Sequence, residues 1–330
     1  MTKSFQVVGI GNAIIDILAY VSDEFLAKNQ IKKGVMNLIN SERSKELFRQ
    51  ISVTKKIAGG SAANTIVGLS QLGIKTSYIG KVYDDEFGKF FTDDLNSNNV
   101  EYGVSDKFDS SNFSTGHCIV LVTPDGERTM NTYLGVTEFL SKDDLNLNIL
   151  QNSGWLYLEG YRYDGVDSQK AFEIAIDHSK KGGGKVALSL SDPFCVKRHR
   201  AKFIKIINNG VDLVFCNEKE LISLTEQTDL HAALKSSSDF PCKFICTVAE
   251  KGVYIKHKGS WINISTNNVK IKDTTGAGDL FATGFLYGIL SGNEDPVSCE
   301  FANKCAGEVI RTLGCRLDKK QLLGLLQKII

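Results

Sequence analysis

The chain alternates between mostly apolar runs of five or six residues and longer segments in which apolar residues recur at helical spacing. The apolar runs predict strands at residues 5–10, 77–82, 155–159, 185–190, 211–216 and 243–248. The segments between them predict helices at residues 61–72, 168–181, 198–209 and 218–225. Apolar strands that alternate with helices are typical of a mostly parallel sheet with helices on both faces. The pattern therefore predicts a large α/β body.

A second pattern interrupts this alternation. Residues 14–21 and 35–39 have strand character, and residues 117–134 predict a hairpin that turns at Pro124-Asp125-Gly126. Because strands joined by a hairpin do not fit inside a doubly wound sheet, we expect a small antiparallel sheet that forms a lid on the body. The C-terminal part is predicted to be helical, at residues 279–291, 296–313 and 318–329.

The length of the chain and its net charge limit the classes of domain and partner that we expect. The 330 residues suffice for one large α/β domain with an appendage. The 39 basic and 38 acidic residues nearly cancel, which leaves a net charge of +1. We therefore expect neither nucleic acid nor a membrane surface as a partner.

The cysteines and the apolar N-terminal segment bear on the cellular compartment. Several of the eight cysteines lie in apolar runs, as Cys216 and Cys246 do, which favours buried thiols over disulfides or a zinc site. Residues 5–21 are interrupted by Asn12 and Asp16, no cleavage site follows, and no apolar run reaches about 18 residues. These features predict a cytoplasmic protein without a signal sequence or a spanning helix.

Two common nucleotide-binding motifs are absent. Gly9-Ile10-Gly11 ends the first strand, but residue 14 is Ile where a dinucleotide-binding fingerprint needs Gly or Ala. Gly184-Lys185 is followed by Val186, where a Walker motif needs Ser or Thr. The protein-kinase motifs HRD and DFG do not occur. A nicotinamide-dependent enzyme is therefore not expected.

The segment Asp273-Thr274-Thr275-Gly276-Ala277-Gly278-Asp279 carries the strongest chemical signal. Small residues at the start of an apolar helix expose consecutive backbone N–H groups, and the helix dipole adds positive potential there, so the segment predicts an anion site. Asp279 at this helix start is a candidate base. The alternative is that Asp279 is an ordinary helix N-cap.

Three further polar elements are candidates for ligand binding. Asn217 and Glu220 follow a predicted strand, where they would meet phosphate and Mg²⁺ or simply form a capping box. Gly60 and Asn64 open a helix at which the alternative is a plain turn capped by Ser61. Asn12 and Asp16 form the fourth element; a substrate diol would satisfy Asp16, although a Lys or Arg partner or an exposed strand face would do so too.

In this order, the four elements resemble the signatures of the PfkB (ribokinase-like) family of carbohydrate and nucleoside kinases. DTTGAGD resembles the C-terminal signature of the family, AGGSAANTIVGLSQLG its N-terminal signature and NEKE its N-x-x-E motif. The resemblance spans nearly the whole chain. Within the family it is greatest to the adenosine kinases, through the segments GNAIIDILA, SLSDPFCV, STGHC, ERTMNTYL and RTLGC.

The resemblance implies one ribokinase-like kinase domain over residues 1–330, with a mostly parallel central sheet flanked by helices. It also implies a small β-sheet lid from about residues 12–40 and 100–136 and an ATP-binding half from about residues 185–330. The implied reaction is transfer of the γ-phosphoryl group of ATP to the 5′-hydroxyl of adenosine or a close purine nucleoside, with Asp279 as the base. The alternatives are a sugar kinase of the same family and a non-catalytic nucleoside-binding homologue, and the implied assembly is a monomer or a homodimer.

The resemblance further implies roles for individual residues. Substrate contacts are expected from Asn12, Asp16, Gly60, Asn64, Cys118, Met130, Leu134, Tyr161 and Phe194. Phosphate contacts are expected from Gly276, Ala277, Gly278 and Arg128, and ATP contacts from Asn217, Thr247, Thr275 and Asn303. Mg²⁺ is expected near Glu220 through water, and K⁺ at Asp273 and Thr275. The sequence departs from the family pattern at Ala249, where a Gly is frequent, and at Arg162, where adenosine kinases often carry a second aromatic residue.

Overall fold

A computed structural model describes residues 3–103 and 113–326, which form two sheets of unequal size. The larger sheet has nine strands in the order β14-β13-β12-β11-β10-β9-β1-β5-β6. Its strands are β1 Phe5–Ile10, β5 Thr76–Ile79, β6 Glu101–Tyr102, β9 Ser153–Glu159, β10 Lys185–Ser189, β11 Leu213–Asn217, β12 Lys243–Thr247, β13 Val253–His257 and β14 Ser260–Ile264. In this order, the neighbouring strands β12, β11, β10, β9, β1, β5 and β6 pair in parallel, whereas β13 and β14 form an antiparallel edge. The predicted mostly parallel sheet is confirmed.

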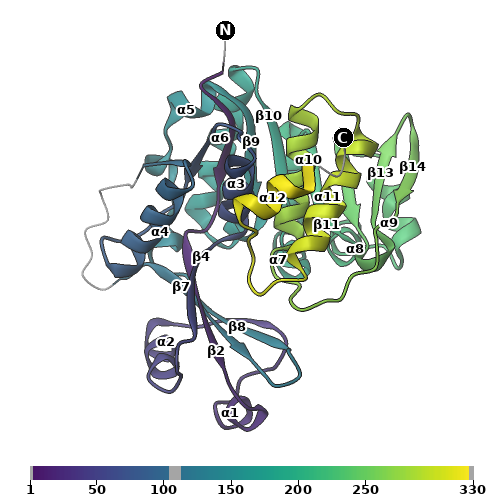
Figure 1. Ribbon diagram of the computed structural model, residues 1–330. Coiled ribbons are helices and arrows are strands. Elements are labelled where there is room, and N and C mark those ends of the chain that lie inside the picture. Colours follow the sequence, from purple (N-terminus) through teal and green to yellow (C-terminus); the bar gives the residue numbers. More distant parts are fainter. Residues whose placement is uncertain (1–2, 104–112, 327–330) are drawn as a thin grey trace.

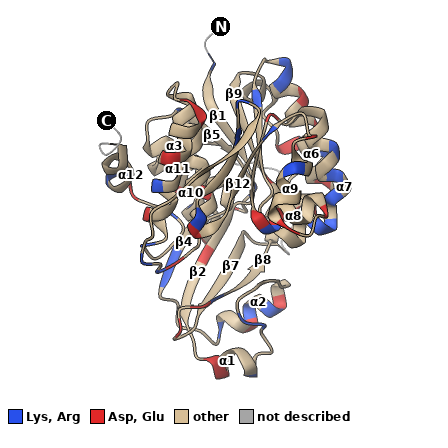
Figure 2. Ribbon diagram, turned by 90° about the vertical axis from the view of Figure 1, so that its right-hand side faces the viewer, with Lys and Arg blue, Asp and Glu red and all other residues tan. Residues whose placement is uncertain are grey.

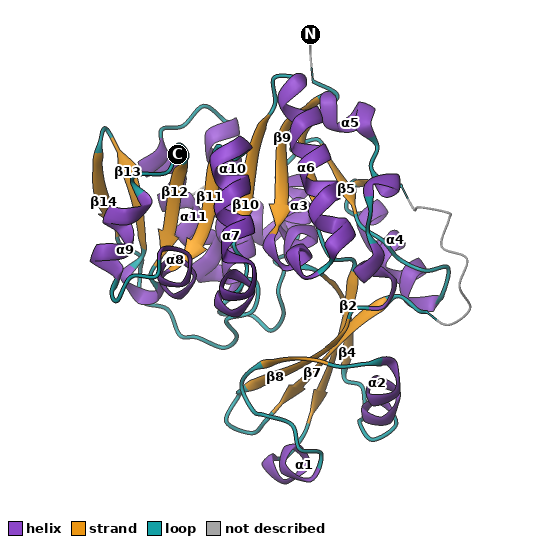
Figure 3. Ribbon diagram, turned by 180° about the vertical axis from the view of Figure 1, so that it is seen from behind, coloured by secondary structure: helices purple, strands orange, loops and turns teal. Residues whose placement is uncertain are grey.

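Helices cover both faces of this sheet, because the central strands are apolar on both sides (Figure 3). One face carries α5 Leu147–Gln151, α6 Val166–Lys181, α7 Pro193–Gly210, α8 Glu218–Thr225 and α9 Leu230–Ser237. The other carries α3 Ser61–Gln71, α4 Glu86–Ser97, α10 Ala277–Leu290 and α11 Asp295–Val309, with α12 Lys319–Leu326 packed beside them. Two apolar clusters result, one on each side of the sheet.

The smaller sheet projects from one end of the body and forms the lid (Figure 1). Its order is β3-β8-β7-β2-β4, with β2 Ile14–Tyr20, β3 Met36–Leu38, β4 Lys55–Gly59, β7 Gly116–Val122 and β8 Arg128–Tyr133. Helices α1 Asp23–Lys28 and α2 Ser41–Phe48 pack on one face of it, and its other face carries Leu18, Cys118 and Val120. The lid therefore has an outer face covered by helices and an inner face turned to the rest of the protein.

The lid is a mixed sheet, so the prediction of an antiparallel lid is wrong. The predicted hairpin of β7 and β8 is present, and β2 pairs antiparallel with β4, but β2 pairs in parallel with β7 and β3 with β8. The chain leaves the body into the lid twice, through β2 and again through β7, and the two strands run in the same direction. This long-range parallel pairing leaves no turn signal in the sequence.

Element boundaries differ from the prediction mainly near the C-terminus and in the short elements. Helix α11 ends at Val309 rather than at residue 313, because the main-chain oxygen of Ile310 accepts hydrogen bonds from the N–H groups of Lys272 and Asp273. Strand β4, the pair β13–β14 and the helices α1, α2, α4, α5 and α9 were not predicted. Residues 104–112 of the predicted lid and residues 327–329 of the predicted last helix lie outside the described residues.

The outer helices α6 and α7 carry both basic and acidic residues, coloured blue and red in Figure 2. Three basic residues of α7 have acidic partners: Arg198 pairs with Asp164, Arg200 with Glu226 and Lys205 with Glu173. All eight cysteines are unpaired thiols, as predicted. Over the residues that the structure describes, none of the helices has the length and apolar character to cross a bilayer.

Candidate active site

A cavity of about 1040 Å³ lies between the lid and the carboxyl ends of the parallel strands. Each central strand brings a polar residue to it at or just beyond its last position: Asn12 after β1, Glu159 in β9, Ser191 after β10, Asn217 in β11 and Thr247 in β12. The carboxyl edge of a parallel sheet is where α/β proteins bind ligands. The volume exceeds what one drug-sized ligand usually needs, so the cavity has room for two reactants.

Asp279 lines the cavity from the first turn of α10. Its Oδ1 accepts a hydrogen bond from Ser61 Oγ at 2.7 Å and its Oδ2 accepts one from Asn64 Nδ2 at 2.9 Å. Burial raises the pKa of Asp279 to about 6, although both hydrogen bonds and the charge of Arg316 oppose the rise. The helix is capped by Gly276 without a side-chain hydrogen bond, so the interpretation of Asp279 as a helix cap is wrong.

The backbone before Asp279 is shaped by its glycines. Gly276 has φ +79°, and a Cβ there would lie 2.3 Å from the main-chain oxygen of Cys315. A Cβ on Gly278 would meet no protein atom within 4 Å, although Gly278 lines the cavity. Side chains in this turn would therefore occupy the space beside the N-terminus of α10, where an anion is favoured. Gly276, Ala277 and Gly278 all line the cavity, at the place predicted for phosphate.

Arg128 connects the lid to the segment Asp273–Asp279, which we call the anion loop. Its guanidinium forms an ion pair with Asp273, and Nη1 donates to Thr275 Oγ1 at 2.9 Å. Asp273 also accepts from Thr275 N at 2.9 Å and from Gly314 N at 2.7 Å, so both of its oxygens have protein donors. Arg128 is not part of the cavity lining in this arrangement. The potassium contact at Asp273 and Thr275 stays a prediction.

Asn12 and Gly60 meet at the end of β1. Asn12 Nδ2 donates to Glu159 Oε1 at 2.7 Å, and its Oδ1 accepts from Arg162 Nη1 at 2.7 Å. Gly60 has φ +97°, and a Cβ there would lie 2.1 Å from the main-chain oxygen of Asn12. Asn12 and Gly60 line the cavity, although the Asn12 side chain is directed toward protein partners.

Asp16 lies on β2 at the junction of lid and body and lines the cavity. Burial raises its pKa to about 6; the charge of Arg316 lowers it, that of Asp279 raises it, and that of Arg128 lowers it. Within the described part of the chain, no Lys or Arg nitrogen lies within 4 Å of its carboxylate. The interpretation of Asp16 as a structural ion pair is therefore not supported.

The lid contributes an apolar wall. Its cavity-lining side chains include Ile14, Met36, Leu38, Cys118, Met130 and Leu134, and Tyr161 lines the body side. Phe194 does not join them, because it is 67% exposed and lies outside the cavity lining. It occupies the first turn of α7, where Asp192 Oδ1 accepts a hydrogen bond from Phe194 N at 2.8 Å and Pro193 fixes the helix start.

The departures from the family pattern have different structural consequences. Arg162 is turned into the protein interior, where it is 2% exposed and donates to Asn12, to the main-chain oxygen of Glu138 and to Ser168 Oγ. It therefore supplies no wall to the cavity. Ala249 has φ +48° and lines the cavity beside Thr247.

The residues predicted to contact ATP have hydrogen-bond partners within the protein. Asn217 Oδ1 accepts from Glu220 N at 2.9 Å, and Glu220 Oε2 accepts from Asn217 N at 3.0 Å, which is a capping box. The capping-box interpretation is therefore confirmed, while both residues still line the cavity. Thr247 and Asn303 line it as well, with Asn303 Nδ2 donating to the main-chain oxygens of Ile264 and Ser265 at 3.2 Å.

The residues around Glu220 fit a Mg²⁺ ion that is bound mainly by phosphate and water. Nowhere in the described ranges do three or more His, Cys, Asp or Glu side chains gather as a metal site. Mg²⁺ usually keeps several waters and binds one or two carboxylates together with substrate phosphates. Burial raises the pKa of Glu220 to about 7, and its oxygens already accept hydrogen bonds from Asn217. The donor set thus fits an ion held by phosphates and water beside Glu220, not a preformed protein site.

Several side chains that hold the predicted residues in place were not predicted. Ser61 binds Asp279 rather than capping α3, so the interpretation of Ser61 as a cap is wrong. Glu159 is buried with its pKa raised to about 7 by burial, and accepts from Asn12 and from Ala62 N. Its place at the end of an apolar parallel strand could have identified it. Arg316 lies in a loop that carries no pattern from which its contacts could be predicted.

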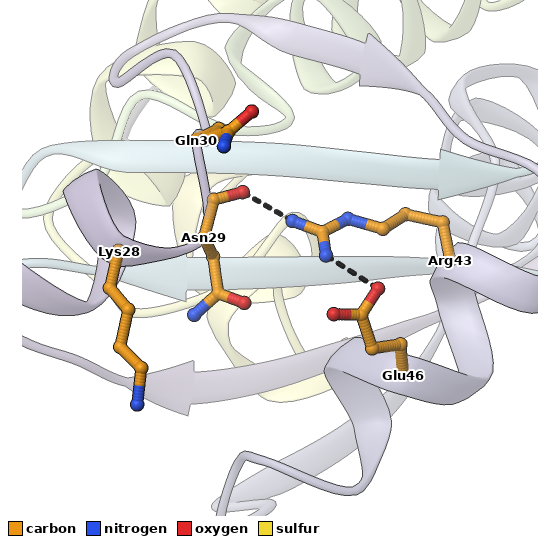
Figure 4. A pocket seen from close by; sticks show the side chains of 5 residues that line it. All are labelled: Lys28, Asn29, Gln30, Arg43 and Glu46. Atoms are coloured by element: carbon orange, nitrogen blue, oxygen red, sulfur yellow. Dashed lines mark hydrogen bonds and ion pairs between the residues drawn. The ribbon is translucent and has the colours of Figure 1, made fainter.

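A second, smaller pocket lies at the tip of the lid (Figure 4). It is lined by Lys28, Asn29, Gln30, Arg43 and Glu46. Arg43 pairs with Glu46 at 2.6 Å and donates to the main-chain oxygen of Asn29. The guanidinium of Arg43 is therefore already paired within the protein.

Solved structures with the same architecture are kinases. The chain has a TM-score of 0.92 and 35% identity to a probable sugar kinase from Rhizobium etli CFN 42, covering 100% of both chains. It has a TM-score of 0.90 and 36% identity to adenosine kinase from Sinorhizobium meliloti, covering 98% of this chain and 99% of that one. Both similarities extend over the body and the lid.

Sequence comparison leads to the same group of enzymes. The model of the pfkB family of carbohydrate kinases matches residues 32–322. Adenosine kinase from Saccharomyces cerevisiae is 26% identical, over 92% of this chain and 94% of that protein. A 5-dehydro-2-deoxygluconokinase from Clostridium botulinum is 27% identical, over 80% of this chain and 81% of that protein. Relatives of similar identity thus act on different acceptors.

Proposed function

The chain belongs to the pfkB family of carbohydrate kinases, and we propose that it transfers the γ-phosphoryl group of ATP to the 5′-hydroxyl of adenosine or a close purine nucleoside. Family membership makes the protein a phosphotransferase that acts on an alcohol. The nucleoside acceptor is our proposal. It is supported by the adenosine kinases among its relatives and by the lining of the cavity.

The observation that carries the proposal is the position of Asp279. Its carboxylate lies in one cavity with the lid side chains and with the residues at the ends of β11 and β12. Ser61 and Asn64 hold it through neutral donors and leave its charge uncompensated by an ion pair. With a pKa of about 6, it is ionised at neutral pH and can take the proton of an attacking hydroxyl.

The anion loop would supply the electrostatic part of the reaction. Phosphoryl transfer depends mainly on positioning and on stabilising charge on the phosphoryl oxygens. The N-terminus of α10, with Gly276, Ala277 and Gly278, offers backbone N–H groups and a positive dipole end at this point. Arg128 is tied to the same loop and would add positive charge by exchanging Asp273 for a phosphate oxygen. We propose that Asn217, Thr247, Thr275 and Asn303 contact ATP.

The divalent ion would be held beside Glu220 through water. A Mg²⁺ ion bound there would neutralise charge on the transferring phosphates. We further propose that Asp16 accepts hydrogen bonds from the ribose diol and that Gly60 allows the sugar to approach the backbone. Because the Asn12 side chain is directed to Glu159 and Arg162, it would act with them in placing the ribose.

The apolar wall of the lid favours a nucleoside over a free sugar. Six apolar lid side chains line the cavity, and Leu38 among them is 52% exposed. A purine base would cover such a wall, whereas a bare sugar would leave it in water. Covering this wall with a base would remove apolar surface from water, which favours binding by roughly 25 cal/mol per Å².

A second candidate is a sugar kinase of the same family. The specific observation in its favour is the absence of two expected base contacts, because Phe194 is exposed and Arg162 is directed inward. The probable sugar kinase from Rhizobium etli also covers the whole chain. A non-catalytic nucleoside-binding homologue is less consistent with an intact Asp279 and anion loop.

The test is an ATP-consumption assay with Mg²⁺ over adenosine, inosine, guanosine, ribose, fructose and 5-dehydro-2-deoxygluconate, with and without K⁺. We expect adenosine to have the highest kcat/KM, and ³¹P NMR of the product to place the phosphate on the 5′-oxygen. A free sugar as the best acceptor would overturn the nucleoside proposal. Adenosine binding without ATP consumption on any acceptor would indicate the non-catalytic homologue.

A further inference from the structure

The loop between α11 and α12 places Arg316 behind the proposed base. Arg316 Nε donates to Asn64 Oδ1 at 2.7 Å, and its Nη1 forms an ion pair with Asp94 of α4. The Arg316 side chain is 12% exposed and does not line the cavity. Arg316 therefore lies behind the cavity wall, and its hydrogen bond toward the site is made to Asn64.

The donor chemistry of Arg316 sets the orientation of Asn64. A guanidinium has only donors, so the atom of Asn64 that faces it must be Oδ1, and Cys315 Sγ approaches the same oxygen at 3.5 Å. Asn64 Nδ2 is then left to donate to Asp279 Oδ2 at 2.9 Å. A flipped amide would place donor against donor at Arg316 and acceptor against carboxylate at Asp279, so only one orientation satisfies both neighbours.

We propose that Arg316 is a positioning residue that orients Asn64 and thereby aims the carboxylate of Asp279 at the acceptor hydroxyl. The proposal rests on the proposed role of Asp279 as the base. It assigns Arg316 a function although Arg316 touches neither reactant. It also makes Asp94, Arg316, Asn64 and Asp279 one unit, drawn from four elements: α3, α4, α10 and the loop between α11 and α12.

The loop that carries Arg316 packs directly against the anion loop. Gly314 N donates to Asp273 Oδ2 at 2.7 Å, and Gly276 is packed so closely on Cys315 that a Cβ would lie 2.3 Å from its main-chain oxygen. Arg316 is therefore held in register with the backbone that is proposed to bind phosphate. Small displacements of a reacting group can cost about 100-fold in rate, so this register matters for the chemical step.

Charge adds to the effect of geometry. Asp279 is faced by Ser61 and Asn64 from α3, by Asp16 from β2, by Tyr157 and Glu159 from β9 and by Arg316. Burial raises the pKa of both Asp16 and Asp279, and the positive charge of Arg316 lowers both. Arg316 thus also helps to keep the base ionised.

The test is a double-mutant cycle on kcat with the best acceptor of the wild type. We expect Arg316→Gln to lower kcat by about 10–100-fold, with a smaller change in the KM of the acceptor. In an Asn64→Ala background the same change should lower kcat by less than about 3-fold, because the residue through which Arg316 acts is gone.

Arg316→Lys separates charge from geometry, because Lys keeps the positive charge but lacks the planar fork of donors. We expect this variant to have a pH dependence close to that of the wild type and a kcat that stays below the wild-type value. Arg43→Gln, in the lid-tip pocket, is the matched control with unchanged kcat.

Two results would overturn the proposal: a wild-type kcat in Arg316→Gln, or an equal loss in both backgrounds, which a purely structural role predicts. If Arg316→Gln does not fold, Asp94→Asn removes the other partner of Arg316 without touching the cavity. It should lower kcat by about 3–10-fold in the wild type and not in Asn64→Ala, and an unchanged kcat would overturn the proposal. The cycle is run on whichever acceptor is phosphorylated. A preference for a sugar over adenosine would therefore refute the proposed nucleoside acceptor and leave the proposed role of Arg316 open to the same test.

Discussion

The proposed acceptor side and the proposed nucleotide side of the cavity hold their polar groups in different ways. On the nucleotide side, Asn217 and Glu220 satisfy each other within one turn of helix. On the acceptor side, the partners are far apart in sequence, since Asn12 meets Glu159 across 147 positions and Asn64 meets Asp279 across 215. A local pair forms with its helix, whereas a distant pair exists only when the whole fold has closed. The acceptor side is therefore where a substitution should damage chemistry more than stability.

The largest effect should come from Asp279→Asn. Because Asn cannot accept the proton, we expect kcat to fall by about 10²–10⁴-fold while the Kd of the nucleoside changes by only a few fold. Kinetics and calorimetric titration measure the two quantities, and Asp177→Asn, a surface carboxylate paired with Lys181, is the control. Near wild-type turnover would remove Asp279 from the role of base.

The next effect concerns the diol and Asp16. A buried carboxylate that loses a hydroxyl donor is left short of a partner, so 2′-deoxyadenosine and 3′-deoxyadenosine should be poorer than adenosine by about 100-fold or more in kcat/KM. In Asp16→Ala the preference for the ribonucleoside should shrink, although the absolute rate falls. If the variant keeps the full preference, another group recognises the diol.

The pH dependence should follow the carboxylates of the acceptor side. Burial raises the pKa of two of them, Asp279 and Asp16, to about 6, so both lose their charge as the pH falls through 6. We expect kcat to be constant above pH 7 and to decrease by about tenfold per pH unit, or more steeply, below pH 6. Stopped assays in constant ionic strength buffers measure this. An acid limb near pH 4 would mean that these carboxyls are not buried during catalysis.

The smallest effects should appear on the nucleotide side, at Glu220. Gln can still complete a capping box, so Glu220→Gln should leave Tm nearly unchanged while raising the Mg²⁺ concentration for half-maximal rate by a few fold. Glu220→Ala also removes the box and should lower Tm by about 1–2 °C, for a loss of about 1 kcal/mol. If the Mg²⁺ dependence of Glu220→Gln equals that of the wild type, Glu220 serves the helix alone.

Most of the body could be predicted from the sequence, but the lid could be predicted only in part. Strand β1 and helix α8 match their predicted bounds, because an apolar run or a capped amphipathic turn is a local property. Strand β4, KKIAG, has no alternation that marks it, and it is a strand because β2 offers it a partner. The pairing of β2 with β7 joins segments about a hundred residues apart, which no local pattern encodes.

The sequence by itself determined which residue types are present for chemistry: a glycine-rich turn that ends in Asp279, the Asn217–Glu220 box and the polar residues at strand ends. Spacing, helix capping and backbone freedom depend on residues that are close in the sequence. The contacts that these side chains make depend on the tertiary structure. It turned Phe194 outward, directed Arg162 to Asn12 and placed Arg316 behind Asn64. The physical reason is that a buried polar side chain takes whichever partner the packed fold brings within hydrogen-bonding distance, and that partner can come from any part of the chain.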